Sequence, residues 1–164
     1  MTNLSGRSII LLKVFPDQLG NAHREISRMP NVTNVWPILG SYDLLVSAGF
    51  SDYEGLRNLV GEMRSKPYCQ ECKVHPGFMD WEREGARDTP MKGWVFIDTA
   101  DFDSTFEELK KIDKVNYVVS ISGEYNMVAG LGVEGFQEYG NILRNNVLTI
   151  PGVRRTETYT HTPE

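Results

Sequence analysis

The stretch GSYDL at residues 40–44 returns as GEYNM at residues 123–127, a displacement of 83 residues (123 − 40). The same displacement pairs positions on either side of this stretch, among them Val32 with Val115 and Leu12 with Val95. A fixed displacement over a long stretch is the signature of a duplicated supersecondary unit. The chain of 164 residues is therefore predicted to contain two copies of one small module, packed against each other.

Each copy is predicted to contain, in order, a strand, a helix, two strands, a helix and a strand. In the first copy, residues 8–15 (SIILLKVF) are mostly apolar at both odd and even positions, which point to opposite faces of a strand. This pattern predicts a strand covered on both faces. Residues 51–54 have the Ser-x-x-Glu form of a capping box, which predicts a helix that Pro67 ends. The order βαββαβ is typical of a four-stranded antiparallel sheet with both helices on one face.

The uncovered face of each sheet needs a partner, and the other copy is the obvious one. The predicted fold class is therefore α+β, with two ferredoxin-like repeats whose sheets pack face to face as a pseudo-dimer, similar to a dimeric α+β barrel. The first repeat is expected at residues 1–78, a connector at 79–91 and the second repeat at 92–164. Phe78, Met79 and Trp81 are too apolar for a free linker, so they are expected to dock on the body.

Bulk properties exclude several classes of protein. The formal net charge is −5, whereas proteins that bind duplex nucleic acid usually carry a basic face. No apolar run reaches the roughly 18 residues that cross a bilayer, and the start of the chain lacks the pattern of a signal peptide. Two cysteines do not make a disulfide framework. These features predict a cytoplasmic protein without direct contact to nucleic acid or membrane.

The repeated turn is the most specific candidate site. Glycine reaches positive φ without a steric clash, so an ordinary hairpin turn would explain Gly40. Asp43 could accept a charge-assisted hydrogen bond from an ammonium group, and Tyr42 offers a ring and a hydroxyl. Alternatively, the Asp or Asn side chain satisfies backbone amides of the turn while the Tyr fills a gap in the core.

The repeated turn, the βαββαβ order and the closing residues 151–153 (PGV) with an alternating Thr strand resemble the Lrp/AsnC ligand-binding domain. That domain is also called the regulation of amino acid metabolism domain. The resemblance implies a homo-oligomer that binds a small-molecule effector, an amino acid, in transcriptional or metabolic regulation, without enzymatic activity or a cofactor. The ligand-binding residues that it implies are Gly40, Ser41, Tyr42 and Asp43 in the first copy and Gly123, Glu124, Tyr125 and Asn126 in the second.

Two departures from the family pattern matter. Family members usually carry a helix-turn-helix before this domain, whereas here the first strand starts near Ser8. The chain therefore looks like a stand-alone tandem version, with helix-turn-helix-bearing family members as candidate partners. Asn126 stands where the first copy has Asp43, so the second turn lacks the carboxylate and the first turn is favoured.

Two other functions stay open. Paired ferredoxin-like sheets also build small monooxygenases and haem enzymes, which would need a polar or His-bearing sheet face; here only Lys13 and Asp98 interrupt the apolar strands. Cys69 and Cys72 form a Cys-x-x-Cys motif that, with His75 close behind it, could hold zinc or act as a redox sensor. Aligned on the second copy, the two cysteines lie in a strand and would point to opposite faces unless a bulge intervenes. We therefore expect no metal site and no catalytic residue.

Overall fold

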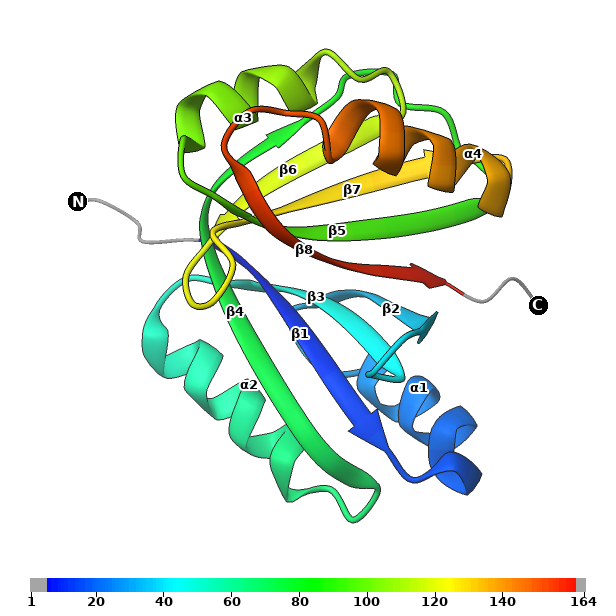
Figure 1. Cartoon of the computed structure of the whole chain (residues 1–164). Coiled ribbons are helices and arrows are strands. Elements are labelled where there is room, and N and C mark those ends of the chain that lie inside the picture. Colours follow the sequence, from blue (N-terminus) through cyan, green and yellow to red (C-terminus); the bar gives the residue numbers. More distant parts are fainter. Residues whose placement is uncertain (1–5, 162–164) are drawn as a thin grey trace. The chain divides into compact units, whose positions relative to one another are not determined.

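The computed structural model describes residues 6–161, and for residues 78–80 the backbone alone (Figure 1). The chain divides into two compact units, residues 1–78 and residues 79–164. In the described part of the chain, no helix is both long and apolar enough to cross a membrane.

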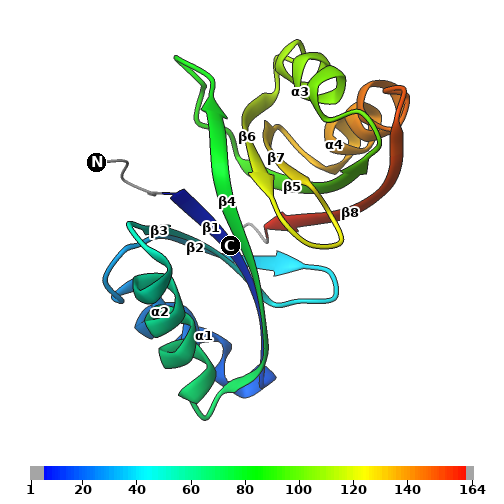
Figure 2. The ribbon, with the colours of Figure 1, turned by 90° about the vertical axis from the view of Figure 1, so that its left-hand side faces the viewer.

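Unit 1 has the predicted order βαββαβ. Its elements are β1 (Gly6–Val14), α1 (Leu19–Ser27), β2 (Val32–Leu39), β3 (Leu44–Phe50), α2 (Tyr53–Ser65) and the first part of β4 (Cys69–Glu82). The antiparallel pairings of β1 with β3 and β4, and of β2 with β3, give the strand order β2-β3-β1-β4. Figure 2 shows α1 and α2 on the same face of this sheet, and apolar side chains of both helices share one core with alternate strand residues.

Unit 2 repeats this layout. Its elements are β5 (Met91–Thr99), α3 (Phe102–Lys110), β6 (Val115–Ile121), β7 (Met127–Val133), α4 (Phe136–Ile142), a π-helical turn (Leu143–Val147) and β8 (Val153–His161). The strand order is β6-β7-β5-β8, and α3 and α4 contribute to a second apolar core. The prediction of an α+β chain with two ferredoxin-like repeats is confirmed.

The displacement between the repeats is not constant. Leu12 pairs with Leu44, and its counterpart opposite Met127 is Ile97, so the first strands are displaced by 85 residues (97 − 12). The pairing of Leu12 with Val95 is therefore wrong by two residues. Unit 1 has two more residues than unit 2 between its first strand and its first helix, where a short 3₁₀ turn (Pro16–Gln18) precedes α1.

The displacement changes again after the second helix. Pro67 corresponds to Pro151, a displacement of 84 (151 − 67), so unit 2 has one extra residue there. The π-helical turn accommodates it, closed by a hydrogen bond from the Leu148 amide to the Leu143 carbonyl at 2.8 Å. A single inserted residue is the usual origin of such a turn inside an α-helix.

Two local expectations need correction. Asp52, not Ser51, caps α2, because its carboxylate accepts a hydrogen bond from the Gly55 amide at 2.7 Å. β4 continues to Glu82 and β5 begins at Met91, so only residues 83–90 of the expected connector lie outside strands. Trp81 packs against the core of unit 2 as predicted, whereas the side chains of Phe78 and Met79 lie outside the described residues.

Candidate functional site

The turn of unit 1 is tied to the end of β1 by Asp43. Gly40 has a φ of 144°, which favours glycine, and the Ile38 amide donates to the Asp43 carbonyl at 2.9 Å. The Asp43 amide donates to the Leu12 carbonyl at 2.8 Å, and its carboxylate oxygen Oδ2 accepts from the Val14 amide at 2.9 Å. Asp43 therefore clamps the turn to the neighbouring strand through both its backbone and its side chain.

Unit 2 has the same clamp at the equivalent positions. Gly123 has a φ of 122°, and the Asn126 amide donates to the Ile97 carbonyl at 2.9 Å. The Asn126 side chain accepts from the Thr99 amide at 3.1 Å and donates to the Thr99 carbonyl at 2.9 Å. This shared clamp explains why both copies retained Asp or Asn at this position.

The two clamps differ in one respect. Asn126 uses both of its side-chain heteroatoms on Thr99. Asp43 uses only Oδ2, and its second oxygen, Oδ1, accepts no hydrogen bond from the residues that the structure describes. The Asp43 side chain is half-buried, so one negatively charged oxygen is held in a fixed orientation at the surface of the turn.

The two tyrosines of the turns are also engaged within their own units. The Tyr42 hydroxyl donates to a Glu71 carboxylate oxygen at 2.8 Å, and Ser41 beside it is exposed. Tyr125 is buried; its ring meets the Phe96 ring edge-on, and the Arg155 guanidinium lies 4.9 Å from its centroid. Burial, and then the charge of Glu157, raise the pKa of the Tyr125 hydroxyl.

Arg155 also holds the turn of unit 2 from outside. Its guanidinium donates to the Glu124 carbonyl at 2.9 Å. The structure thus brings the four predicted residues of each turn together in a hairpin corner, and it gives the side chains of Tyr42, Asp43 and Asn126 hydrogen-bond partners inside the same unit.

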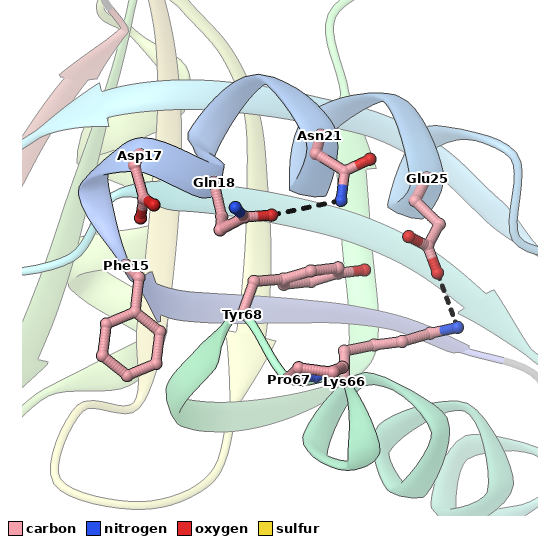
Figure 3. Close-up of a pocket in the computed structure, with 8 residues that line it drawn as sticks. All are labelled: Phe15, Asp17, Gln18, Asn21, Glu25, Lys66, Pro67 and Tyr68. Carbon is pink, nitrogen blue, oxygen red and sulfur yellow. Dashed lines mark hydrogen bonds and ion pairs between the residues drawn. The ribbon is translucent and has the colours of Figure 1, made fainter.

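A pocket of about 680 Å³ lies at the same end of unit 1 as the turn. Its lining comes from the 3₁₀ turn, from α1 and from the junction between α2 and β4 (Figure 3): Phe15, Asp17, Gln18, Asn21, Glu25, Lys66, Pro67 and Tyr68. None of these residues was predicted as a site residue.

The pocket contains one buried polar group without a partner among the described residues. Tyr68 is 4% exposed, and its hydroxyl makes no hydrogen bond with that part of the chain. Burial, followed by the charge of Glu25, raises the pKa of Tyr68 to about 12, so the hydroxyl is protonated at neutral pH. Beside it, Lys66 Nζ lies 2.6 Å from Glu25 Oε1, and this ion pair raises the pKa of Lys66.

The residue of unit 2 that corresponds to Tyr68 is a glycine. The Phe15 amide donates to the Tyr68 carbonyl at 3.0 Å, as the Ala100 amide donates to the Gly152 carbonyl at 2.8 Å, so Tyr68 corresponds to Gly152. Gly152 has a φ of 97°, and a Cβ atom there would lie 3.4 Å from the Asp101 backbone nitrogen. No sequence signal pointed to this pocket, because the change of displacement around Pro16–Gln18 is visible only in the pairing of the strands.

A smaller pocket of about 320 Å³ lies in unit 2 under the segment 83–90. Arg83, one of the cations in its lining, donates to the carbonyls of Lys110 at 2.7 Å, Ile112 at 3.0 Å and Val115 at 2.9 Å. Arg83 therefore satisfies carbonyl groups that the end of α3 leaves open. Its role is structural.

The two cysteines lie on one face of β4, contrary to the expectation for a regular strand. Cys69 pairs with Val14 and Cys72 with Leu12, so three steps along β4 match two steps along β1. A β-bulge between these pairs accommodates the extra residue of β4. Both cysteines pack against the core of unit 1, and burial raises the pKa of Cys69 and raises that of Cys72 to about 11. The described residues contain no group of three or more His, Cys, Asp or Glu side chains that could hold a metal ion.

The sheet face of unit 1 away from the helices carries a buried histidine. His75 is 3% exposed, and its Nδ1 lies 3.2 Å from the Ile9 carbonyl oxygen. His75 follows Val74, which packs on the helix side, so its side chain points to the opposite face. The expectation that only Lys13 and Asp98 interrupt the apolar strands therefore missed this residue.

Residues 7–76 and 94–162 match the family model for the Lrp/AsnC ligand binding domain. No curated protein matches the chain. Among solved structures, the siroheme decarboxylase NirDL is similar over 96% of this chain and 71% of its own, with a TM-score of 0.71 and 10% identity. TTHA0845 from Thermus thermophilus shares 20% identity over 48% of this chain and 99% of its own, with a TM-score of 0.45.

A third similar structure is the transcriptional regulator NMB0573 from Neisseria meningitidis in complex with L-Met, with 16% identity over 52% of this chain and 57% of its own and a TM-score of 0.47. The expectation that this chain is not an enzyme has to be withdrawn, because NirDL is an enzyme with the same fold across nearly the whole chain. The family supports a regulatory role in binding an effector. Since the family model matches most of both units, the chain belongs to the Lrp/AsnC ligand-binding domain family.

Proposed function

We propose that this chain binds a free amino acid at the turn of unit 1, where Asp43 Oδ1 accepts hydrogen bonds from the ligand's ammonium group. The observation that carries the proposal is the unequal use of the two clamps. Asp43 has one carboxylate oxygen without a partner among the described residues, whereas the neutral Asn126 has both heteroatoms engaged.

The clamp also makes the carboxylate a good receptor for a cation. The Val14 amide holds Oδ2 at 2.9 Å, so little side-chain freedom is left to lose when a ligand binds. A hydrogen bond to a charged group contributes about 1.5–3 kcal/mol, which corresponds to about a tenfold to a hundredfold change in affinity. Membership of a ligand-binding domain family supports a small-molecule effector, and the proposal adds its chemical class and its contact.

The test separates the charge of Asp43 from its clamp. A thermal-shift screen against the twenty amino acids identifies the ligand, since binding to the folded state raises its stability. Calorimetry then compares the chain with the Asp43→Asn variant, which keeps the clamp as Asn126 does but removes the charge. We expect the affinity to fall at least about tenfold. The matched control is Asp103→Asn, which removes an equal charge from the first turn of α3 and should leave the affinity unchanged.

Unchanged affinity in Asp43→Asn would contradict the assignment of the ammonium to this carboxylate. The same incubations are followed by mass spectrometry of the ligand, because a protein with this fold can act as an enzyme. A ligand that is recovered intact acts as an effector, and one that is converted is a substrate.

The family relationship also supports self-association and, as partners, relatives that carry a helix-turn-helix. Light scattering of the chain with and without the identified amino acid tests self-association and its dependence on the ligand. A monomer under both conditions would contradict this part of the proposal.

A further inference from the structure

We propose that the pocket of unit 1 lined by Phe15, Asp17, Glu25, Lys66 and Tyr68 is a second binding site, and that it takes a small aliphatic diamine in its cationic form. This site is separate from the turn of the proposed function. Asp43 does not line the pocket; it contacts Val14, whereas the pocket begins at Phe15, whose amide bonds to the Tyr68 carbonyl.

The buried hydroxyl of Tyr68 is the first observation. A buried polar group without a partner destabilises the folded protein, so such groups are rare in native structures. Tyr68 is 4% exposed, lines the pocket and has no partner for its hydroxyl among the described residues. A ligand that donates a hydrogen bond to this oxygen would remove that cost.

The charges of the lining select a cation. The pocket contains two carboxylates, Asp17 and Glu25, and one ammonium group, Lys66. Glu25 is paired with Lys66 at 2.6 Å, but the Asp17 carboxylate has neither a hydrogen bond nor an ion pair with the described residues. The site therefore has one uncompensated negative charge. Glu62 adds to the negative potential at Tyr68.

Lys66 occupies only Oε1 of Glu25, and Glu25 Oε2 has neither a hydrogen bond nor an ion pair with the described residues. Asp17 and Glu25 Oε2 can therefore each accept from one end of a molecule with an amine at each end. Figure 3 shows the Tyr68 ring between the side chains of α1 and Lys66, with Asp17 near Phe15 and Glu25 at the other end. Phe15 is 45% exposed, and with Pro67 and the Tyr68 ring it offers apolar surface for an alkyl chain between the amines. Ammonium groups are also attracted to aromatic faces.

The repeat supplies an internal comparison. In unit 2 the position of Tyr68 is Gly152, and the position of Lys66 is Ile150, which is buried in the core. The extra residues around Pro16–Gln18 are absent there as well. The turn, the hydroxyl and the ion pair thus occur together in unit 1 and are all absent from the equivalent positions of unit 2, as expected if they form one site.

The probe for the test is putrescine, with the corresponding uncharged diol as its isostere. We expect saturable binding of putrescine to the full chain by calorimetry and no binding of the diol. Tyr68→Phe and Asp17→Asn should each weaken putrescine binding at least about tenfold. The control Asp103→Asn removes an equal charge from the first turn of α3 and should leave binding unchanged.

Three results would overturn the inference. These are no saturable heat with putrescine, equal binding of the diol, or losses in Tyr68→Phe and Asp17→Asn no larger than in Asp103→Asn. The result is independent of the proposed function, because Asp43→Asn should leave putrescine binding intact and Tyr68→Phe should leave amino acid binding intact. If each variant affects only its own ligand, the two sites are separate.

Discussion

Removing the hydroxyl of Tyr68 is expected to stabilise the folded chain. The hydroxyl is buried without a partner among the described residues, and leaving such a group unpaired costs about 1–3 kcal/mol. Tyr68→Phe deletes the polar atom and keeps the ring in place. The free energy of unfolding should therefore rise by about 1 kcal/mol or more in the absence of ligand. For a chain of this size, about 1 kcal/mol corresponds to a shift in Tm of about 2–4 °C.

Urea unfolding followed by tryptophan fluorescence measures this change, with calorimetric Tm as a second readout. The chain offers a matched control in Tyr139, which is equally buried but donates its hydroxyl to the Trp94 carbonyl at 3.0 Å and lies 3.3 Å from the Tyr159 carbonyl. Tyr139→Phe should lower the free energy of unfolding by about 1 kcal/mol. A loss of stability in Tyr68→Phe as large as in Tyr139→Phe would refute the reasoning, since it would mean that the Tyr68 hydroxyl is satisfied in the folded chain.

Three further predictions concern the clamp, the close approach at Gly93 and the thiols. Asp43→Ala should lower the free energy of unfolding by about 1.5–3 kcal/mol in urea titrations, because the Val14 amide loses its charged partner, while Asp43→Asn should cost less. Gly93→Ala should cost about 1–3 kcal/mol by the same assay, because a Cβ atom there would overlap the Tyr139 ring, and the loss should shrink in a Tyr139→Ala background. Cys69 and Cys72 should react slowly with a thiol reagent at neutral pH and faster toward pH 11, because burial raises their pKa; rapid reaction at neutral pH would contradict this.

The same pKa shifts set the sign of a pH effect on stability. Unfolded thiols ionise near their ordinary pKa of 9.0, whereas folded Cys72 ionises at about 11. Between these values the folded state binds more protons than the unfolded state, so stability falls as pH rises through this window. Replacing Cys72 by Ala should flatten the unfolding free energy between pH 9 and 11 relative to the unaltered chain, as measured by urea titration.

The comparison of the two repeats shows where sequence patterns suffice and where they do not. The repeated turn predicted the duplication of the βαββαβ unit, and the continuous apolar run at residues 8–15 predicted the first strand, because both signals can be found in the sequence alone. The displacement could not show that Leu12 corresponds to Ile97, since insertions of two residues keep the same side of a strand facing the core. The two extra residues of unit 1 were detected only from the register in which the strands pair in the sheet.

The cysteine motif shows the same limit. Residues three apart point to opposite faces of a regular strand, but the bulge opposite Lys13 and Val14 brings Cys69 and Cys72 to one face. A bulge is a property of how two strands pair, so neither strand's sequence reveals it alone.

For the candidate site, the sequence by itself determined the family resemblance, the glycine at each turn and the difference between Asp43 and Asn126. These are properties of single positions and of their repetition. Only the tertiary structure showed that both side chains clamp the neighbouring strand, and that among the described residues one oxygen of Asp43 and the buried hydroxyl of Tyr68 have no partner. Hydrogen-bond satisfaction depends on groups that lie far apart in the chain and meet only after folding, as Asp43 meets Val14 and Tyr68 meets Phe15.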